Sequence, residues 1–88
     1  MSTSGSMKER IYERLTTELQ PEKLDVINQS HLHAGHAGDD GSGESHFKIL
    51  IECEALKALS YVNRERSIHK ALSDEMPKIH ALSIQFMS

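Results

Sequence analysis

The stretch HFKILIEC, residues 46–53, alternates between apolar and more polar side chains. Phe47, Ile49 and Ile51 fall on one side of an extended chain, and a lysine, a leucine and a glutamate alternate with them. Successive side chains of a β-strand point to opposite faces, so this alternation predicts a strand with one apolar face. Such a face is buried only against another layer, so we expect a sheet that is covered on one side.

A second alternating stretch, KLDVINQ, occupies residues 23–29. Leu24 and Val26 share one face of the expected strand, and Asp25 falls on the other. The two strands flank a segment rich in histidine and glycine, and the glycines exclude a regular helix there. The pattern predicts a β-hairpin with an unusually long connection, and connections of that length are generally functional or disordered.

Residues 6–21, SMKERIYERLTTELQP, predict an amphipathic helix. An apolar residue recurs at every fourth position from Met7 to Leu19, which makes one continuous stripe. Ser6 is followed three residues later by Glu9, which is the pattern of a capping box at a helix start. The proline at the end of the segment stops the helix.

Residues 60–77, SYVNRERSIHKALSDEMP, predict a second long helix, with Ser60 as its cap and Pro77 as its end. Its expected apolar stripe consists of Tyr61, Ile68, Leu72 and Met76. Just before it, EALKAL at residues 54–59 predicts a helical turn. After it, KIHALSIQF at residues 78–86 alternates again and predicts a third strand.

The resulting order is helix, strand, strand, helix, strand. It predicts an α+β fold, a two-layer αββαβ domain whose helices cover one three-stranded sheet. We expect a disordered N-terminal tail over residues 1–6 and a single domain over residues 7–88.

The composition narrows the class of protein. The chain contains no run of about 18 apolar residues, which predicts no membrane span, and its start lacks the apolar region of a secretory signal. Its one cysteine, Cys53, cannot form an internal disulfide and is expected to be a buried, inert thiol. These features predict a cytoplasmic protein, or one of the mitochondrial matrix or a plastid in a eukaryote.

An enzyme is not expected. The chain of 88 residues has no nucleophile elbow, phosphate-binding loop or metalloprotease motif. A domain of this size has a thin core and little room for a deep pocket. The net charge of −3 also argues against general nucleic-acid binding, although a local basic patch remains compatible with it.

His31, His33 and His36 form an H-x-H-x-x-H array in the glycine-rich segment, with Asp39 and Asp40 close by. Imidazole and carboxylate both suit Zn²⁺ and Ni²⁺, so the array could bind such an ion by itself. The spacing on a glycine-rich loop favours a solvated loop over a preformed zinc site.

The remaining histidines lie in the expected regular elements. His80 opens the third strand in phase with Leu82 and Ile84, and this pattern alone favours a core or edge histidine. His46 begins the second strand, and we expect its ring to tie the base of the loop to the backbone. His69 lies on the second long helix and is expected to be exposed.

Three blocks of sequence resemble the BolA family. They are ESHFKILI at residues 44–51, NRERSIHKAL at residues 63–72 and IHALSI at residues 79–84, and they occur in the family's order. The resemblance covers roughly residues 7–86. It implies the αββαβ fold, similar to the class II KH fold but without the GXXG loop that grips nucleic acid.

The resemblance also implies a partner and a cofactor. BolA proteins pair with monothiol glutaredoxins, which implies a heterodimer that bridges a [2Fe–2S] cluster with thiolates from glutaredoxin and glutathione. His80 matches the family's histidine before Ala-Leu and is implied as one ligand. The second ligand is implied to come from the loop between the first two strands. Counting three residues forward from Ser30 gives His33, whereas counting back from ESHF gives a position nearer His36. We prefer His33 and keep His36 as the alternative; the isolated protein is expected to be a monomer without a tightly bound cofactor.

The alternative function is that of a DNA-binding transcriptional regulator using the KH-like surface, because BolA proteins are also discussed in that role. The second long helix and its approach are locally basic through Lys57, Arg64, Arg66 and Lys70. These cations suit DNA phosphates or an acidic partner. They also suit a solvated helix face with salt bridges to Glu65 and Asp74. The family often has His–Arg where this chain has Glu65–Arg66, which speaks against a role for a helix histidine at this position.

Overall fold

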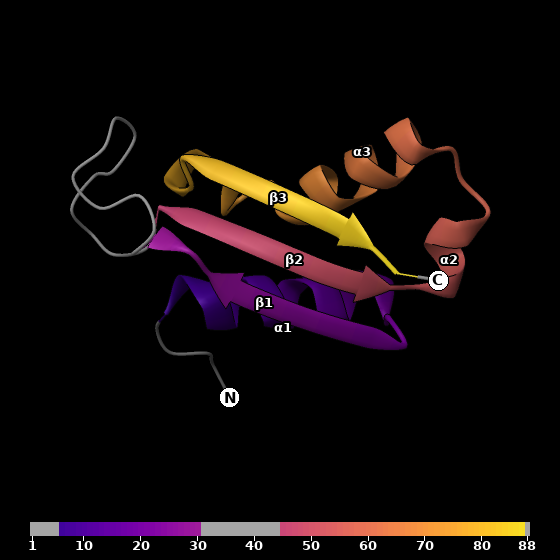
Figure 1. The fold of residues 1–88 in the computed structure, drawn as a ribbon, viewed down its shortest axis with the longest axis horizontal. Helices are drawn as coiled ribbons and strands as arrows, with labels where there is room; N and C mark the ends of the chain where they lie inside the picture. Colours follow the sequence, from indigo (N-terminus) through magenta and orange to yellow (C-terminus); the bar gives the residue numbers. More distant parts are fainter. Residues whose placement is uncertain (1–5, 31–44, 88) are drawn as a thin grey trace.

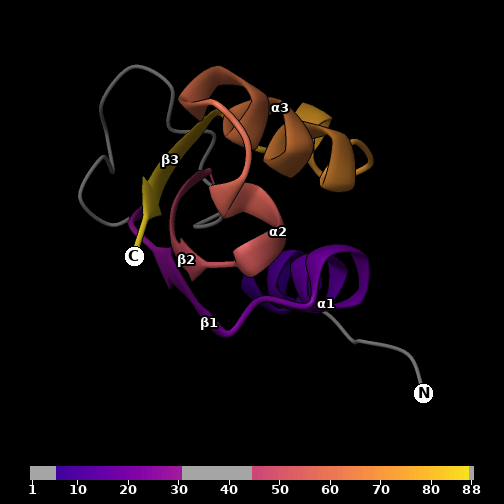
Figure 2. The same cartoon turned by 90° about the vertical axis from the view of Figure 1, so that its right-hand side faces the viewer.

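The computed structural model describes residues 6–30 and 45–87, and it has two layers (Figures 1 and 2). One layer is a three-stranded sheet, and the other consists of helices that cover one of its faces. The predicted αββαβ order is confirmed, with two short helices between its main elements: α2, at the predicted helical turn, and the 3-10 helix η2, which was not predicted. The elements are α1 (Met7–Leu19), β1 (Lys23–Asn28), β2 (His46–Glu52), α2 (Glu54–Lys57), α3 (Tyr61–Ala71), the 3-10 helix η2 (Met76–Lys78) and β3 (Ala81–Phe86).

The sheet has the order β1-β2-β3, so the strand from which the sequence analysis began lies at its centre. Strand β1 pairs antiparallel with β2 and confirms the hairpin, with Val26 opposite Ile49. Strand β3 pairs parallel with β2, with Ile84 opposite Ile49. The parallel pairing means that β2 and β3 begin at the same end of the sheet, and the chain needs α2 and α3 to return to that end.

The core lies between the sheet and the two longer helices. The apolar face of β2 is fully buried, as its alternation predicted, and the stripe of α1 belongs to the same buried cluster. Helix α3 contributes Ile68, and Leu72 follows at its end. The buried apolar residues are Met7, Ile11, Leu15, Val26, Phe47, Ile49, Ile51, Cys53, Leu56, Ile68, Leu72 and Ile79.

Helix α1 has the limits that the sequence indicates. The hydroxyl of Ser6 accepts a hydrogen bond from the backbone N–H of Glu9 at 3.1 Å, which confirms Ser6 as the cap. At the other end, Gln20 adopts a left-handed conformation with φ 50° and ψ 56°, and its N–H donates to the carbonyl of Thr16. A left-handed residue reverses the chain, and this allows β1 to begin at Lys23.

The second long helix is shorter than predicted. Helix α3 ends at Ala71 instead of continuing to Met76, because Leu72 departs from helical geometry with φ −101° and ψ 22°. The N–H groups of Glu75 and Met76 then both donate to the carbonyl of Leu72 and form turns. Pro77 therefore lies within η2 and does not terminate α3.

Two further expectations about this region were wrong. Tyr61 was expected on the apolar stripe of the helix, but it is 58% exposed and its ring contacts Phe86 edge-on, with the centroids 5.4 Å apart. The third strand begins at Ala81, three residues later than predicted. The residues before it belong to η2 and to the turn that leads into the strand.

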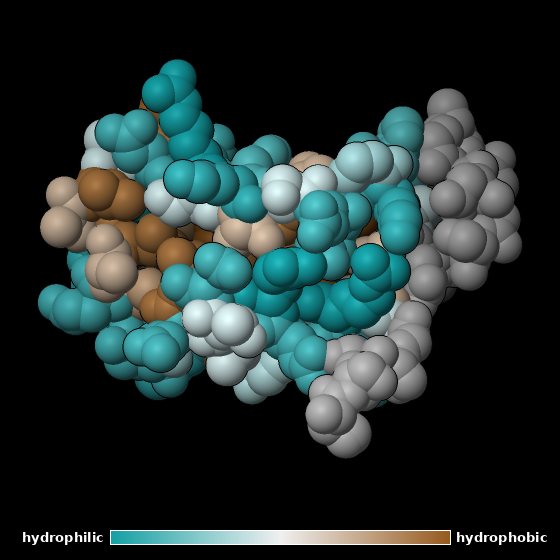
Figure 3. Space-filling model, turned by 180° about the vertical axis from the view of Figure 1, so that it is seen from behind, coloured by the Kyte–Doolittle hydropathy of each residue, from teal (hydrophilic) through white to brown (hydrophobic). Residues whose placement is uncertain are grey.

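On the helix side of the molecule, apolar surface gathers toward the left end in Figure 3, and polar side chains cover much of the rest. Among the described residues, no helix is long and apolar enough to cross a membrane. Of the predicted tail, residues 1–5 lie outside the described residues, and Ser6 serves as the cap of α1.

Candidate functional site

His80 lies directly before β3, with its side chain exposed at the end of the sheet where β2 begins. Its backbone N–H donates to the carbonyl of Ser45 at 2.8 Å, and the N–H of Ala81 donates to the same oxygen at 3.2 Å. The prediction placed His80 inside the strand. The strand starts one residue later, so the backbone of His80 is held by Ser45 and its imidazole is left in solvent.

His46 is the first residue of β2 and is buried. Its Nδ1 lies 2.7 Å from the hydroxyl oxygen of Ser45, and its ring centroid lies 5.2 Å from that of His80, with the two planes inclined by 46°. The structure corrects one detail of the expected structural role, because the ring contacts a side chain where the sequence analysis expected the backbone. The ring is held by the neighbouring serine hydroxyl and lies against the ring of His80.

Ser30 joins the end of β1 to the beginning of β2. Its hydroxyl oxygen accepts hydrogen bonds from the N–H groups of Ser45 at 2.8 Å and His46 at 3.0 Å. The hydroxyl also lies 3.4 Å from the carbonyl oxygen of His46, to which it can donate, and the N–H of Gln29 donates to that carbonyl at 2.8 Å. Ser30 is 4% exposed and Ser45 is fully buried. We call Ser30, Ser45 and His46 the serine bridge.

The sequence analysis missed both serines of this bridge. A serine beside a glycine-rich loop is ordinarily read as a solvated loop residue, because hydroxyl side chains favour turns and surfaces. The only signal was their position, one on each side of the long connection and directly next to the two strands. A buried polar group needs hydrogen-bond partners, and these became visible only when the strands were paired.

The predicted loop ligands His33 and His36 lie outside the described residues, as do His31, Asp39 and Asp40 of the possible zinc array. Their roles stay predictions. Within residues 6–30 and 45–87, no three His, Cys, Asp or Glu side chains gather closely enough to hold a metal ion. The imidazoles that the described chain brings together are those of His46 and His80.

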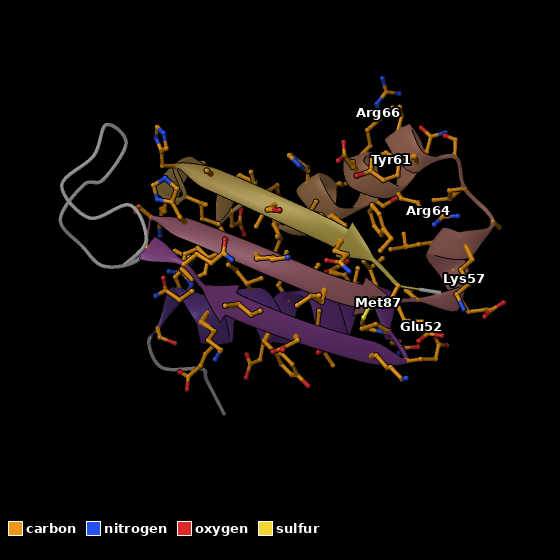
Figure 4. The ribbon with its side chains drawn as sticks, viewed as in Figure 1. Glu52, Lys57, Tyr61, Arg64, Arg66 and Met87 are labelled. Atoms are coloured by element: carbon orange, nitrogen blue, oxygen red, sulfur yellow. The ribbon has the colours of Figure 1, made fainter. Side chains whose placement is uncertain are left out.

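The three cations proposed for nucleic acid do not share one face. Arg64 is half-buried, and its guanidinium donates to the carbonyls of Leu59 at 3.1 Å and Lys57 at 3.2 Å and lies 5.8 Å from the ring centroid of Phe86. Arg66 extends away from the sheet (Figure 4). Arg66 and Lys70 are both exposed and are four residues apart, so they lie on one side of α3.

The salt bridges expected around the basic helix form with other partners. Lys57 pairs with Glu52 at 3.1 Å, close to the end of β2 (Figure 4). This hydrogen bond raises the pKa of Lys57 above its ordinary value, against the opposing effect of desolvation. Asp74 pairs with Arg14 of α1 at 3.1 Å.

A family model described as BolA-like protein matches residues 15–88. This chain belongs to the BolA family. It is 41% identical over 75 residues to the DNA-binding transcriptional regulator BolA of Vibrio cholerae, with 84% of this chain and 67% of that protein covered. The chain is also 45% identical over 85 residues to SufE-like protein 1, chloroplastic/mitochondrial, of Arabidopsis thaliana. That match covers 91% of this chain but only 23% of the longer relative.

The structure agrees with this membership. The solved BolA domain of SufE1 from Arabidopsis thaliana superposes with a TM-score of 0.82 at 41% sequence identity, covering 96% of this chain and 93% of that one. The α+β BolA fold is therefore established, and the implied order of elements is the observed one.

Two further groups of this BolA-like protein are buried and ionisable. Cys53 is buried, as predicted, and its Sγ donates to the carbonyl of Leu19 at 3.3 Å. Glu75 was not singled out from the sequence. Its carboxylate is 2% exposed and lies 3.6 Å from Arg10 and 3.7 Å from Arg14, which ties α1 to the turn that precedes His80.

Chemically, this end of the BolA fold offers one exposed imidazole, that of His80, whose backbone N–H and that of the next residue, Ala81, both donate to the carbonyl of Ser45. Imidazole nitrogen binds transition metals, and a histidine can replace a thiolate on one iron of a [2Fe–2S] centre. The thiol of Cys53 is buried against α1, so the described residues present an imidazole nitrogen and no thiol at the surface.

Proposed function

We propose that this BolA-like protein is an adaptor that binds a monothiol glutaredoxin and contributes histidine ligands to a [2Fe–2S] cluster shared by the two proteins. The role would be cluster trafficking or iron regulation, with no catalysis by this chain. The observation that carries the proposal is the position of His80. It is exposed, backbone-fixed and adjacent to the serine bridge from which the histidine-rich segment departs.

The length of the connecting chain favours His33 as the second ligand. His33 follows Ser30 by three residues, so its Cα can lie no more than about 11 Å from that of Ser30. His36 follows by six residues, and its limit is about twice as large. His33 therefore has the smaller volume to search and costs less entropy to fix.

The metal ligands that the described chain can supply fit a cluster shared with a second protein better than a cluster held by this chain alone. His80 supplies one exposed nitrogen, and Cys53 supplies no accessible sulfur. The proposal therefore assigns the thiolates to glutaredoxin and glutathione. A neutral imidazole leaves the bound cluster less negative than a thiolate would, and it can be protonated, so release would be easier at lower pH.

The test is reconstitution of the mixed complex. The protein is combined with a monothiol glutaredoxin, glutathione, iron and sulfide, and visible absorption and circular dichroism are recorded. His80→Ala and one of His33→Ala and His36→Ala are expected to change the spectrum of the mixed complex. His69→Ala is the matched control, because His69 is an exposed histidine on α3. The proposal fails if the glutaredoxin keeps its own homodimer spectrum, or if His80→Ala leaves the mixed spectrum unchanged.

The proposed compartment is the cytoplasm, or the matrix or a plastid of a eukaryotic cell. The single buried thiol of Cys53 is compatible with a reducing environment. In isolation the protein is proposed to be a monomer.

DNA binding is the second candidate, and two observations favour it. The relative from Vibrio cholerae is named a DNA-binding transcriptional regulator, and Arg66 and Lys70 are exposed on one side of α3. Phosphate contacts make binding fall steeply with salt, so reversing the charge of Arg66 or Lys70 should weaken duplex binding and reduce that slope. Lys8→Glu on α1 is the control for net charge. Undetectable duplex binding at moderate salt, or equal binding by all variants, removes this candidate.

A further inference from the structure

We propose that Ser30 is a positioning residue for His80, acting through Ser45. The inference rests on the proposed function, because it gives a reason for fixing His80 in place. It assigns a role in the site to Ser30, which follows β1 and whose hydroxyl contacts Ser45 and His46.

The first step is the contact between Ser30 and Ser45. The Ser30 hydroxyl is the acceptor for two consecutive N–H groups, those of Ser45 and His46, at 2.8 and 3.0 Å. Its own position is fixed, because the N–H of Ser30 donates to the side-chain oxygen of Asn28 at 2.9 Å. A single buried oxygen therefore sets where the backbone enters β2.

The second step leads from Ser45 to His80. The carbonyl of Ser45 accepts the N–H groups of His80 and Ala81, so the residue fixed by Ser30 is the one that holds His80. The Ser45 hydroxyl also holds the ring of His46, which lies against the ring of His80. The position of His80 thus depends on Ser45 through both backbone and side chain.

Loss of the Ser30 hydroxyl would remove the acceptor of the buried N–H of Ser45. Buried donors need a partner, and Ser45 is fully buried, so the backbone at this point would have to shift to find another acceptor or water. That shift would carry the Ser45 carbonyl with it. His80 would then keep its imidazole but lose its fixed location.

The experiment compares Ser30→Ala with Ser60→Ala. Ser60 is also a serine whose hydroxyl accepts a backbone N–H, that of Asn63 at 3.3 Å, but it caps α3 near the opposite end of the sheet. It therefore reports the effect of losing a serine hydrogen bond elsewhere in the same fold. Ser30→Thr keeps the hydroxyl and tests rescue.

Two readouts are needed, and the first requires no cluster. Amide hydrogen exchange is measured well below the unfolding midpoints of all variants. Ser30→Ala should accelerate exchange at the N–H of His80 by about tenfold or more, because exchange follows the free energy of local opening and the variant leaves a buried donor next to this site without its partner. Ser60→Ala should leave this amide unchanged, and Ser30→Thr should restore its protection.

The second readout is formation of the mixed complex with cluster-loaded monothiol glutaredoxin, followed by visible circular dichroism. Ser30→Ala should weaken the complex by about 10- to 100-fold, and Ser60→Ala should not. If the wild type forms the complex and Ser30→Ala matches Ser60→Ala, the positioning role is overturned while the proposed function stands. If the wild type forms no complex, the proposed function fails. Exchange at His80 then decides the inference alone: acceleration supports it, and no change overturns it.

Discussion

The imidazole rings of His46 and His80 lie with their centroids 5.2 Å apart, although they belong to different strand regions of the chain. Their proximity follows from the register of the parallel pair, in which His46 is opposite Ala81, the residue after His80. A shift of one residue would turn the apolar side chains of β3 to the wrong face, so the same burial that stabilises the sheet also fixes this pair. The core therefore determines the site.

His46→Ala is expected to lower the free energy of unfolding by about 1–3 kcal/mol, because it removes a buried ring and leaves the Ser45 hydroxyl without its imidazole partner. His46→Phe should lower the free energy of unfolding by less, since it keeps an aromatic ring against that of His80. Urea denaturation gives both values, and His69→Ala on the surface of α3 is the control. Equal stability of His46→Ala and His69→Ala would contradict the structural role of His46.

The buried carboxylate of Glu75 and the neighbouring Asp74 make a matched pair for a second prediction. Glu75 is 2% exposed beside Arg10 and Arg14, whereas Asp74 is 72% exposed beside Arg14. Exposed ion pairs contribute about 0–1 kcal/mol, and loss of a buried partner costs more. Glu75→Gln should therefore reduce the free energy of unfolding by about 1–2 kcal/mol and Asp74→Asn by less than about 0.5 kcal/mol. Thermal or urea unfolding of the two variants measures both losses of stability. A larger loss in Asp74→Asn than in Glu75→Gln would refute this ranking.

The strands and α1 could be predicted because each has one buried face, which imposes a period on the sequence. The end of α3 could not. Leu72 is buried although it lies beyond the last helical residue, so its place on the apolar stripe gave no sign of the helix end. The buried Glu75 that follows contacts arginines of α1, which are distant in sequence. Tyr61 fits a helical stripe, but its place near the end of β3 leaves it exposed.

For the site, the sequence offered His80 through its family resemblance, whereas its periodicity alone pointed to an edge or core residue. The serine bridge was not predictable. Ser30 and Ser45 have no periodic pattern, and their burial depends on pairing between residues on opposite sides of the long connection. Polar residues whose partners are distant in sequence carry no signal that a single sequence can display.

Cys53 should be unreactive in the folded protein. Its thiol is buried and donates to the carbonyl of Leu19, so an alkylating reagent reaches it only when β2 separates from α1. Labelling should be slower than in urea by a factor of about 10³ or more, as for a group exposed by global unfolding. An exposed thiol in Ser73→Cys, made in a Cys53→Ala background, is the control and should react at once. Rapid labelling of native Cys53 would show that this edge of the core opens locally.

Gln20 is the non-glycine residue with positive φ in the described chain, and it closes α1 in a left-handed conformation with φ 50° and ψ 56°. A residue with a Cβ loses about 1–2 kcal/mol of stability in this conformation, and glycine does not. Gln20→Gly should therefore raise the free energy of unfolding by about 0.5–1 kcal/mol, after part of the gain is offset by the greater freedom of glycine in the unfolded chain. Glu18→Gly, at an exposed position two residues earlier within the helix, should instead lower it by up to about 1 kcal/mol. Urea unfolding should give changes in the free energy of unfolding of opposite sign for the two glycine variants. A loss of stability in both variants would show that α1 does not end in a left-handed residue at Gln20.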